Sequence, residues 1–65
     1  MAIDFIFNGY CYRVHKKLNL QEILTYFNYQ NKIFVIEYNR IITKNKYQKI
    51  KNNDSIEIIT IVGGG

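Results

Sequence analysis

The first fifteen residues alternate between apolar and polar positions in the manner of a β-hairpin. Ile3, Phe5 and Phe7 occupy every second position, which predicts a strand with one side facing a core. Asn8-Gly9 follows this strand, and the dipeptide favours a type I′ turn because both residues tolerate positive φ. The returning strand is predicted over residues 10–15.

The apolar spacing changes to that of a helix after residue 18. Asn19 precedes Glu22 by three positions, which predicts an N-cap whose side chain is answered by the glutamate. An apolar stripe at helical spacing is made by Leu20, Ile23, Leu24 and Phe27. We expect one helix of about ten residues, ended by the polar segment 28–31.

The second half of the chain reads as strands separated by one long polar segment. Residues 33–38 are rich in β-branched and aromatic side chains, which favours a strand. Asn39-Arg40 closes it and the short apolar pair Ile41-Ile42 follows. The last strand is predicted over residues 55–62.

Residues 43–53 are polar and basic, with Tyr47 and Ile50 as their only large apolar side chains. We therefore expect an ordered connection that these two side chains pin to the core, with Tyr47 as its apolar plug.

The order hairpin, helix, strands, connection and strand predicts an α+β fold. A β-grasp (ubiquitin-like) architecture accommodates it most economically, with a mixed sheet of four to five strands, one main helix across one face and the last strand in the centre. We expect residues 1–62 to form this domain and residues 63–65 to form a flexible C-terminal glycine tail.

Composition excludes several classes of function. With 65 residues the chain supports one domain, and no apolar run approaches the roughly 18 residues of a membrane span. Cys11, His15 and Ser55 are each the only residue of their type. A nucleophile, base and orienting acid therefore do not assemble from the sequence, and we expect neither catalysis nor a bound metal.

Residues 44–51 carry four lysines around Tyr47, close to Arg40, in a chain of net charge +4. Interleaved cations and aromatics are typical of single-strand binders, so a small basic nucleic-acid-binding module is one hypothesis. We favour a solvated loop, because the charge is modest and no RNA-binding motif accompanies it. A basic face could also steer an acidic protein partner.

The chain ends in Gly63, Gly64 and Gly65, directly after the last predicted strand. Three residues without Cβ atoms can thread a narrow channel and carry the terminal carboxylate about 10 Å beyond the folded body. We interpret this end as a substrate that another enzyme activates by adenylation. The outward positions of the last strand next to the tail, Ile59 and Ile61, together with Val62, are a candidate partner-docking patch. The alternative is a strand end that a neighbouring loop covers.

The same residues resemble a known family. Residues 35–39 (V-I-E-Y-N) resemble the V-A-V-E-x-N of the ThiS family, and residues 54–65 (D-S-I-E-I-I-T-I-V-G-G-G) resemble its ending, D-x-I-E-I-V-x-x-V-G-G-G. Asn8-Gly9 stands where the family has N-G, and residues 20–24 where it has L-x-x-L-L. Asn53 replaces a turn glycine, which Asn tolerates because it accepts positive φ.

The resemblance implies a β-grasp sulfur carrier of thiamine biosynthesis. It implies that the Gly65 carboxylate is adenylated by a ubiquitin-activating-like adenylyltransferase, which uses ATP and Mg²⁺, and becomes a thiocarboxylate. A cysteine desulfurase or rhodanese-like donor would supply the sulfur, and thiazole synthase would receive it. The chain itself would bind no cofactor.

Two matters stay open at this level. A carrier for molybdopterin synthesis, or for protein or tRNA thiolation, would share the same tail chemistry. The heavy use of Ile, Asn, Lys and Tyr suggests an A+T-rich coding sequence, so we expect the protein in a cytoplasm or in an organelle stroma such as that of a plastid.

Overall fold

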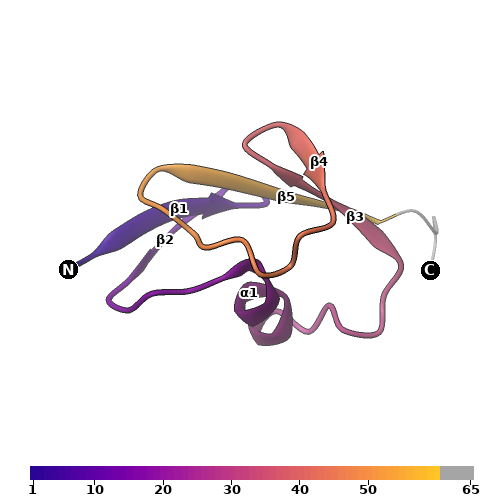
Figure 1. Cartoon of the computed structure of the whole chain (residues 1–65), viewed down its shortest axis with the longest axis horizontal. Helices are drawn as coiled ribbons and strands as arrows, with labels where there is room; N and C mark the ends of the chain where they lie inside the picture. Colours follow the sequence, from indigo (N-terminus) through magenta and orange to yellow (C-terminus); the bar gives the residue numbers. More distant parts are fainter. Residues whose placement is uncertain (61–65) are drawn as a thin grey trace.

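The computed structural model describes residues 1–60, which form five strands and one helix. In chain order they are β1 (Ile3–Phe7), β2 (Tyr10–Val14), α1 (Leu20–Tyr26), β3 (Phe34–Tyr38), β4 (Ile41–Thr43) and β5 (Asp54–Thr60). The strand order is β2-β1-β5-β3-β4, with β5 parallel to β1 and antiparallel to β3. The sheet is therefore mixed and the last strand is central, as predicted (Figure 1).

The helix packs on one face of the sheet, below it in the view of Figure 1. Alternate positions of the strands meet the apolar stripe of α1, since side chains along a strand point to opposite faces. The buried core consists of Ile3, Phe5, Phe7, Leu20, Ile23, Leu24, Ile36, Ile50 and Ile56. Within residues 1–60, no helix has the length and apolar character that crossing a membrane would require.

The first hairpin closes as the sequence predicts. Asn8 and Gly9 both have positive φ, at 50° and 87°, which suits the twist of the flanking strands. The Asn8 side chain also reaches the central strand: its Oδ1 accepts from the Ile58 N–H at 2.8 Å, and its Nδ2 donates to the Tyr29 hydroxyl at 3.2 Å. The turn therefore fastens β5 as well as joining β1 to β2.

The helix begins as predicted and ends earlier. Asn19 Oδ1 accepts from the Glu22 N–H, and the Glu22 carboxylate accepts from the Asn19 N–H, both at 2.9 Å. At the other end Asn28 adopts a φ of 63°, and the Tyr29 N–H donates to the Leu24 carbonyl at 2.9 Å. This left-handed turn stops the helix after seven residues instead of about ten.

The connection before β5 is ordered, but one of its two predicted anchors is wrong. Ile50 is buried, whereas the Tyr47 side chain is 78% exposed. The Lys46 and Gln48 carbonyls accept from the first two N–H groups of α1. Tyr47 lies in the middle of a turn closed by a bond from the Gln48 N–H to the Asn45 carbonyl at 3.2 Å, and its side chain projects outward from this turn. Backbone hydrogen bonds hold this part of the connection in place of an aromatic plug.

Candidate functional site

The sheet face opposite α1 is not covered by any other element of residues 1–60, and we call it the open face. Its positions follow from the strand registers, because they alternate with the buried ones. The open face comprises Asp4, Ile6, Cys11, Arg13, Val35, Glu37, Ile42, Ser55, Glu57 and Ile59.

An apolar row crosses the open face near the end of β5. Ile59 lies opposite Val35 in the β3 register, and the Ile59 side chain is 39% exposed. The structure thus places Ile59 on an accessible face, where the sequence predicts a docking residue. Ile61, Val62 and residues 63–65 lie outside the described residues, so their proposed roles stay predictions.

The next row of the open face holds two carboxylates. Glu37 lies directly opposite Glu57, and Ile42 lies opposite Glu37 on its other side. Like charges that face each other across two strands destabilise a sheet. Sequence reasoning missed this pair: each glutamate stands between apolar residues and so points outward, but only the register puts the two side by side.

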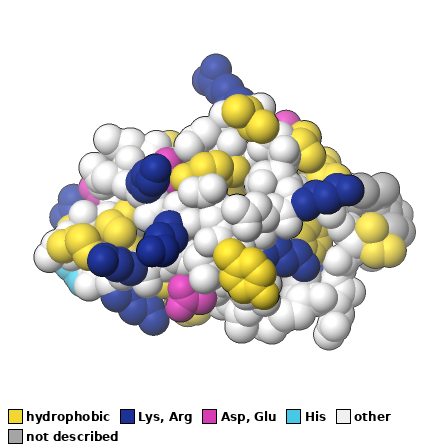
Figure 2. All heavy atoms as spheres, viewed as in Figure 1, with side chains coloured by type: hydrophobic (Ala, Val, Ile, Leu, Met, Phe, Trp, Pro, Cys, Tyr) yellow, Lys and Arg dark blue, Asp and Glu magenta, His cyan; other side chains and the backbone are white. Residues whose placement is uncertain are grey.

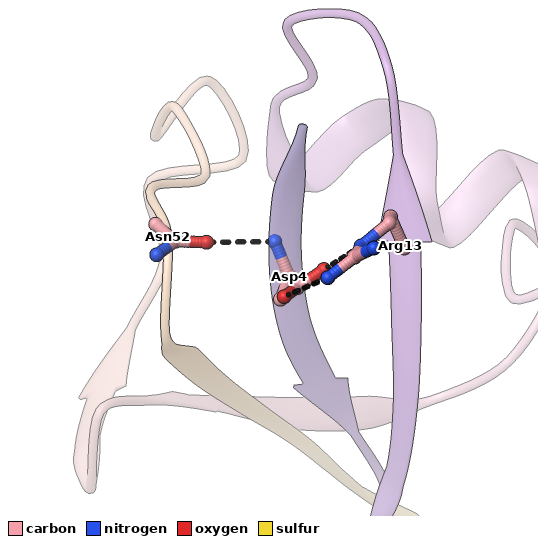
Figure 3. A network of polar contacts seen from close by, with 3 residues as sticks. All are labelled: Asp4, Arg13 and Asn52. Carbon is pink, nitrogen blue, oxygen red and sulfur yellow. Dashed lines mark hydrogen bonds and ion pairs between the residues drawn. The ribbon is translucent and has the colours of Figure 1, made fainter. Parts of the chain in front are cut away.

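At the far end of the open face the charged side chains form an ion pair. Arg13 on β2 donates to both carboxylate oxygens of Asp4 on β1, at 2.6 and 3.0 Å, and the Asp4 N–H donates to the Asn52 side chain at 2.9 Å (Figure 3). The hydrogen bonds from Arg13 lower the pKa of the Asp4 carboxyl below its usual value. The only ion pair within residues 1–60 is therefore at the end of the sheet away from Ile59.

A buried carboxylate organises the start of β5 on the helix side. Asp54 is 6% exposed and accepts from the Tyr38 hydroxyl, from Asn39 Nδ2 at 3.0 Å and from the Lys51 N–H at 2.7 Å. Burial, and then the hydrogen bond and charge of Asp54, raise the pKa of Tyr38 to about 12. The network ties β3, the connection and β5 together. Sequence reasoning began the last strand at residue 55 and did not predict Asp54 as the centre of a hydrogen-bond network.

The residues that carry ordinary enzyme chemistry are not brought into a catalytic group. Cys11 and Ser55 lie on opposite sides of Ile6 in the sheet, and His15 follows the end of β2 as an exposed residue. In the part of the chain that the structure describes, no three His, Cys, Asp or Glu side chains could hold a metal ion together. Within residues 1–60 the structure instead presents an accessible sheet face that extends along β5 to Ile59.

Known proteins resemble this chain in sequence and in fold. The sequence model of the ThiS family matches residues 5–65, nearly the whole chain. The chain belongs to the ThiS family. The resemblance in the motifs is thereby confirmed, and so is the assignment to the ubiquitin-like sulfur carriers of thiamine biosynthesis.

Two individual proteins are similar to this ThiS-family chain. An uncharacterized protein, ycf40, from Trieres chinensis is 45% identical over 67 residues, covering 98% of this chain and 92% of that protein. The crystal structure of a thiamine biosynthesis protein, ThiS, from Geobacter metallireducens has a TM-score of 0.76 at 23% identity, covering 97% of this chain and all of that one. The structural likeness confirms the predicted β-grasp fold.

Proposed function

We propose that the Gly65 carboxylate carries sulfur as a thiocarboxylate for thiazole formation. The observation that carries the proposal is the family match, which extends through the terminal glycine to residue 65. In this proposal the three glycines of residues 63–65, which carry no side chains, let the Gly65 carboxylate enter another enzyme's active site.

In this proposal partner enzymes convert the carboxylate to the thiocarboxylate in three steps. A Gly65 carboxylate oxygen attacks the α-phosphorus of ATP, which gives an acyl adenylate and releases pyrophosphate. A persulfide sulfur on the donor protein then attacks the acyl carbon and AMP leaves, which gives an acyl disulfide. A thiol cleaves this disulfide, is itself oxidised to a new disulfide and frees the thiocarboxylate. In this scheme ATP and Mg²⁺ belong to the adenylyltransferase, and this chain is a co-substrate.

We further propose that the open face docks the activating enzyme. The apolar row of Ile59 and Val35 offers contact area, and the Glu37 and Glu57 carboxylates beside it favour a partner surface with arginines or lysines. A like-charged pair that costs stability in the free protein is relieved when a cation binds between its members. The complementary surface is therefore apolar with a basic rim.

Intact-mass measurement tests the sulfur chemistry. Incubation with the adenylyltransferase, ATP, Mg²⁺ and a sulfur donor should add about 16 Da, the difference between sulfur and oxygen, at Gly65. The chain with Gly65 deleted is the matched control and should stay unmodified with an unchanged circular dichroism spectrum. No mass gain with an enzyme that activates another carrier would reject the proposal.

Two further measurements separate the acceptors and the docking face. Co-purification with thiazole synthase favours the thiazole route, and co-purification with a molybdopterin-synthase large subunit or a thiolation enzyme favours the alternatives. Glu57→Lys should slow association with the adenylyltransferase, whereas Ser55→Lys, two positions away on the same face, should change it less. Equal effects of the two variants would contradict the proposed role of the glutamate pair. The compartment stays a prediction.

A further inference from the structure

A hollow of about 500 Å³ opens on the helix side of the sheet, beside β3 and the end of β4. Its walls include apolar and aromatic side chains from the helix, from the segment after it and from β3. Its polar members are three lysines, two glutamines and one threonine. The residues that matter here are Leu24, Tyr29, Phe34, Lys32, Lys44 and Lys46, and we call this site the lysine hollow.

The backbone of β3 is unpaired where it borders the lysine hollow. The Asn39 N–H donates to the Ser55 carbonyl, so odd-numbered residues of β3 turn their polar groups toward β5 and even-numbered ones turn them toward β4. The β4 pairing ends at Ile36 opposite Thr43. The Phe34 N–H and C=O therefore face the side that β4 has left, and no partner lies there among residues 1–60.

The charges around the hollow are of one sign. Three lysines line it and no Asp or Glu does, and none of the three forms an ion pair within the described residues. Figure 2 shows how Lys and Arg side chains spread over one face of the molecule, with apolar side chains between them. The site therefore favours an apolar ligand that carries negative charge.

The groove on the other side of the helix differs in this respect. That groove, of about 350 Å³, is lined by Arg13, Lys16 and Glu22 among others. Arg13 is paired with Asp4, and Glu22 is engaged with the helix cap. Most of its charge is thus already satisfied within the chain.

A small anion at the helix start does not explain the lysines. The first N–H groups of α1 are taken by the Gln48 and Lys46 carbonyls and by the side chain of Asn19. The helix therefore presents no free donors to a phosphate. The unpaired donor and acceptor that remain belong to a strand edge, which an extended chain can satisfy.

We propose that the lysine hollow binds an extended acidic segment of a partner protein. The segment adds to β3 in line with β4 and pairs with the Phe34 backbone. It places an apolar side chain in the hollow and its carboxylates beside Lys32, Lys44 and Lys46. Strand addition of this kind takes affinity from main-chain hydrogen bonds and specificity from the pocket and the charges. The hollow borders the open face at Val35 and Ile42, but the inference rests on the Phe34 backbone and the three lysines and not on the glycine tail, so it stands apart from the sulfur chemistry.

Fluorescence anisotropy with a labelled peptide tests the proposal. The probe is a short peptide with a central Ile-Val-Val segment and two glutamates at each end. Lys32→Glu/Lys44→Glu/Lys46→Glu should weaken its binding about tenfold or more. The matched control, Lys16→Glu/Lys17→Glu/Lys51→Glu, changes the net charge equally at exposed lysines outside the hollow and should weaken it about threefold at most. Circular dichroism melting of both variants checks that each is folded.

Two further measurements separate strand addition from general attraction. The same peptide with N-methylated central amides keeps its charge and apolar groups but cannot pair as a strand, so it should bind at least about tenfold more weakly. In two-dimensional NMR the Phe34 amide signal should shift downfield when the unmodified peptide is added. Equal losses in the two lysine variants, equal binding of the N-methylated peptide, or a hollow that binds a single-stranded oligonucleotide more tightly than the peptide would each overturn the proposal.

Discussion

The two faces of strand β5 differ in burial and in the kind of residue that they carry. Asp54 and Ile56 turn toward the helix and are buried, whereas Ser55, Glu57 and Ile59 turn to the open face and are exposed. The buried side joins the core and a hydrogen-bonded carboxylate. The exposed side carries an apolar row and a pair of facing glutamates.

This difference indicates that one face of the sheet contributes stability while the other is available for binding. A domain of this size has one core, and the helix can cover only one face of its sheet. The covered face supplies stability, and the uncovered face is left to carry residues that do not favour folding. Four comparisons of variants test whether stability depends mainly on the covered face.

The largest difference is expected between two isoleucines on the same strand. Ile56 is 1% exposed, so Ile56→Ala should lower the free energy of unfolding by about 3 kcal/mol through lost burial and a cavity. Ile59→Ala, at 39% exposure, should cost less than about 1 kcal/mol. Urea unfolding measures both, and similar losses would contradict the division of faces.

Two aspartates provide the next test. Asp54→Ala removes the acceptor of three donors in a part-buried network and should cost about 2 to 3 kcal/mol. Asp4→Ala removes an exposed ion pair on the open face and should cost clearly less. Thermal unfolding of the two variants compares them, and a larger loss for Asp4→Ala would show that the open face carries the stability.

High pH should lower the free energy of unfolding, because Tyr38 on the covered side loses its proton. Its pKa is raised from the model-compound value of 10.0 to about 12 in the folded protein. Because the folded pKa is the higher one, this contribution to stability is complete below about pH 10 and is lost as pH rises toward about 12. Denaturant titrations across this range should show the loss, and Tyr38→Phe should lose less over the same interval. The same slope in the variant would assign the effect to other groups.

The smallest expected effect on stability is a gain and not a loss. Glu57→Gln removes the like charge directly opposite Glu37 in the strand register and should raise stability by about 0.5 kcal/mol. Glu37→Gln should give a similar gain, and the double variant should gain less than the sum because one repulsion is removed once. The same substitutions should weaken docking of a basic partner. Additive gains would mean that the two carboxylates do not interact.

Much of the local structure was predictable because its causes are local. The alternation of Ile3, Phe5 and Phe7, the positive φ of Asn8 and Gly9, and the Asn19 cap each depend on residues within a few positions. The end of the helix was less predictable, since it required one particular asparagine, Asn28, to take the left-handed conformation.

Residues whose roles depend on distant partners were predicted poorly. The sequence predicts Tyr47 as an apolar plug, but Tyr47 lies in a turn whose closing bond joins Gln48 to Asn45, and its side chain is exposed. Arg40 adopts a φ of 70°, a conformation that its residue type does not suggest. The proposed docking role of Ile59 had a sequence signal in its outward position. The lysine hollow had a partial one, because the basic segment 44–51 includes Lys44 and Lys46, but only the fold brings Lys32 beside them.

By itself the sequence determined the order of the elements, the inward and outward positions of each strand and the family, because period, turn chemistry and terminal motif are properties of neighbouring residues. Only the tertiary structure decided that Glu37 faces Glu57, that Asp54 gathers three donors, and that β4 leaves Phe34 unpaired beside three lysines. These facts depend on strand register and chain crossing, which bring together residues far apart in the sequence.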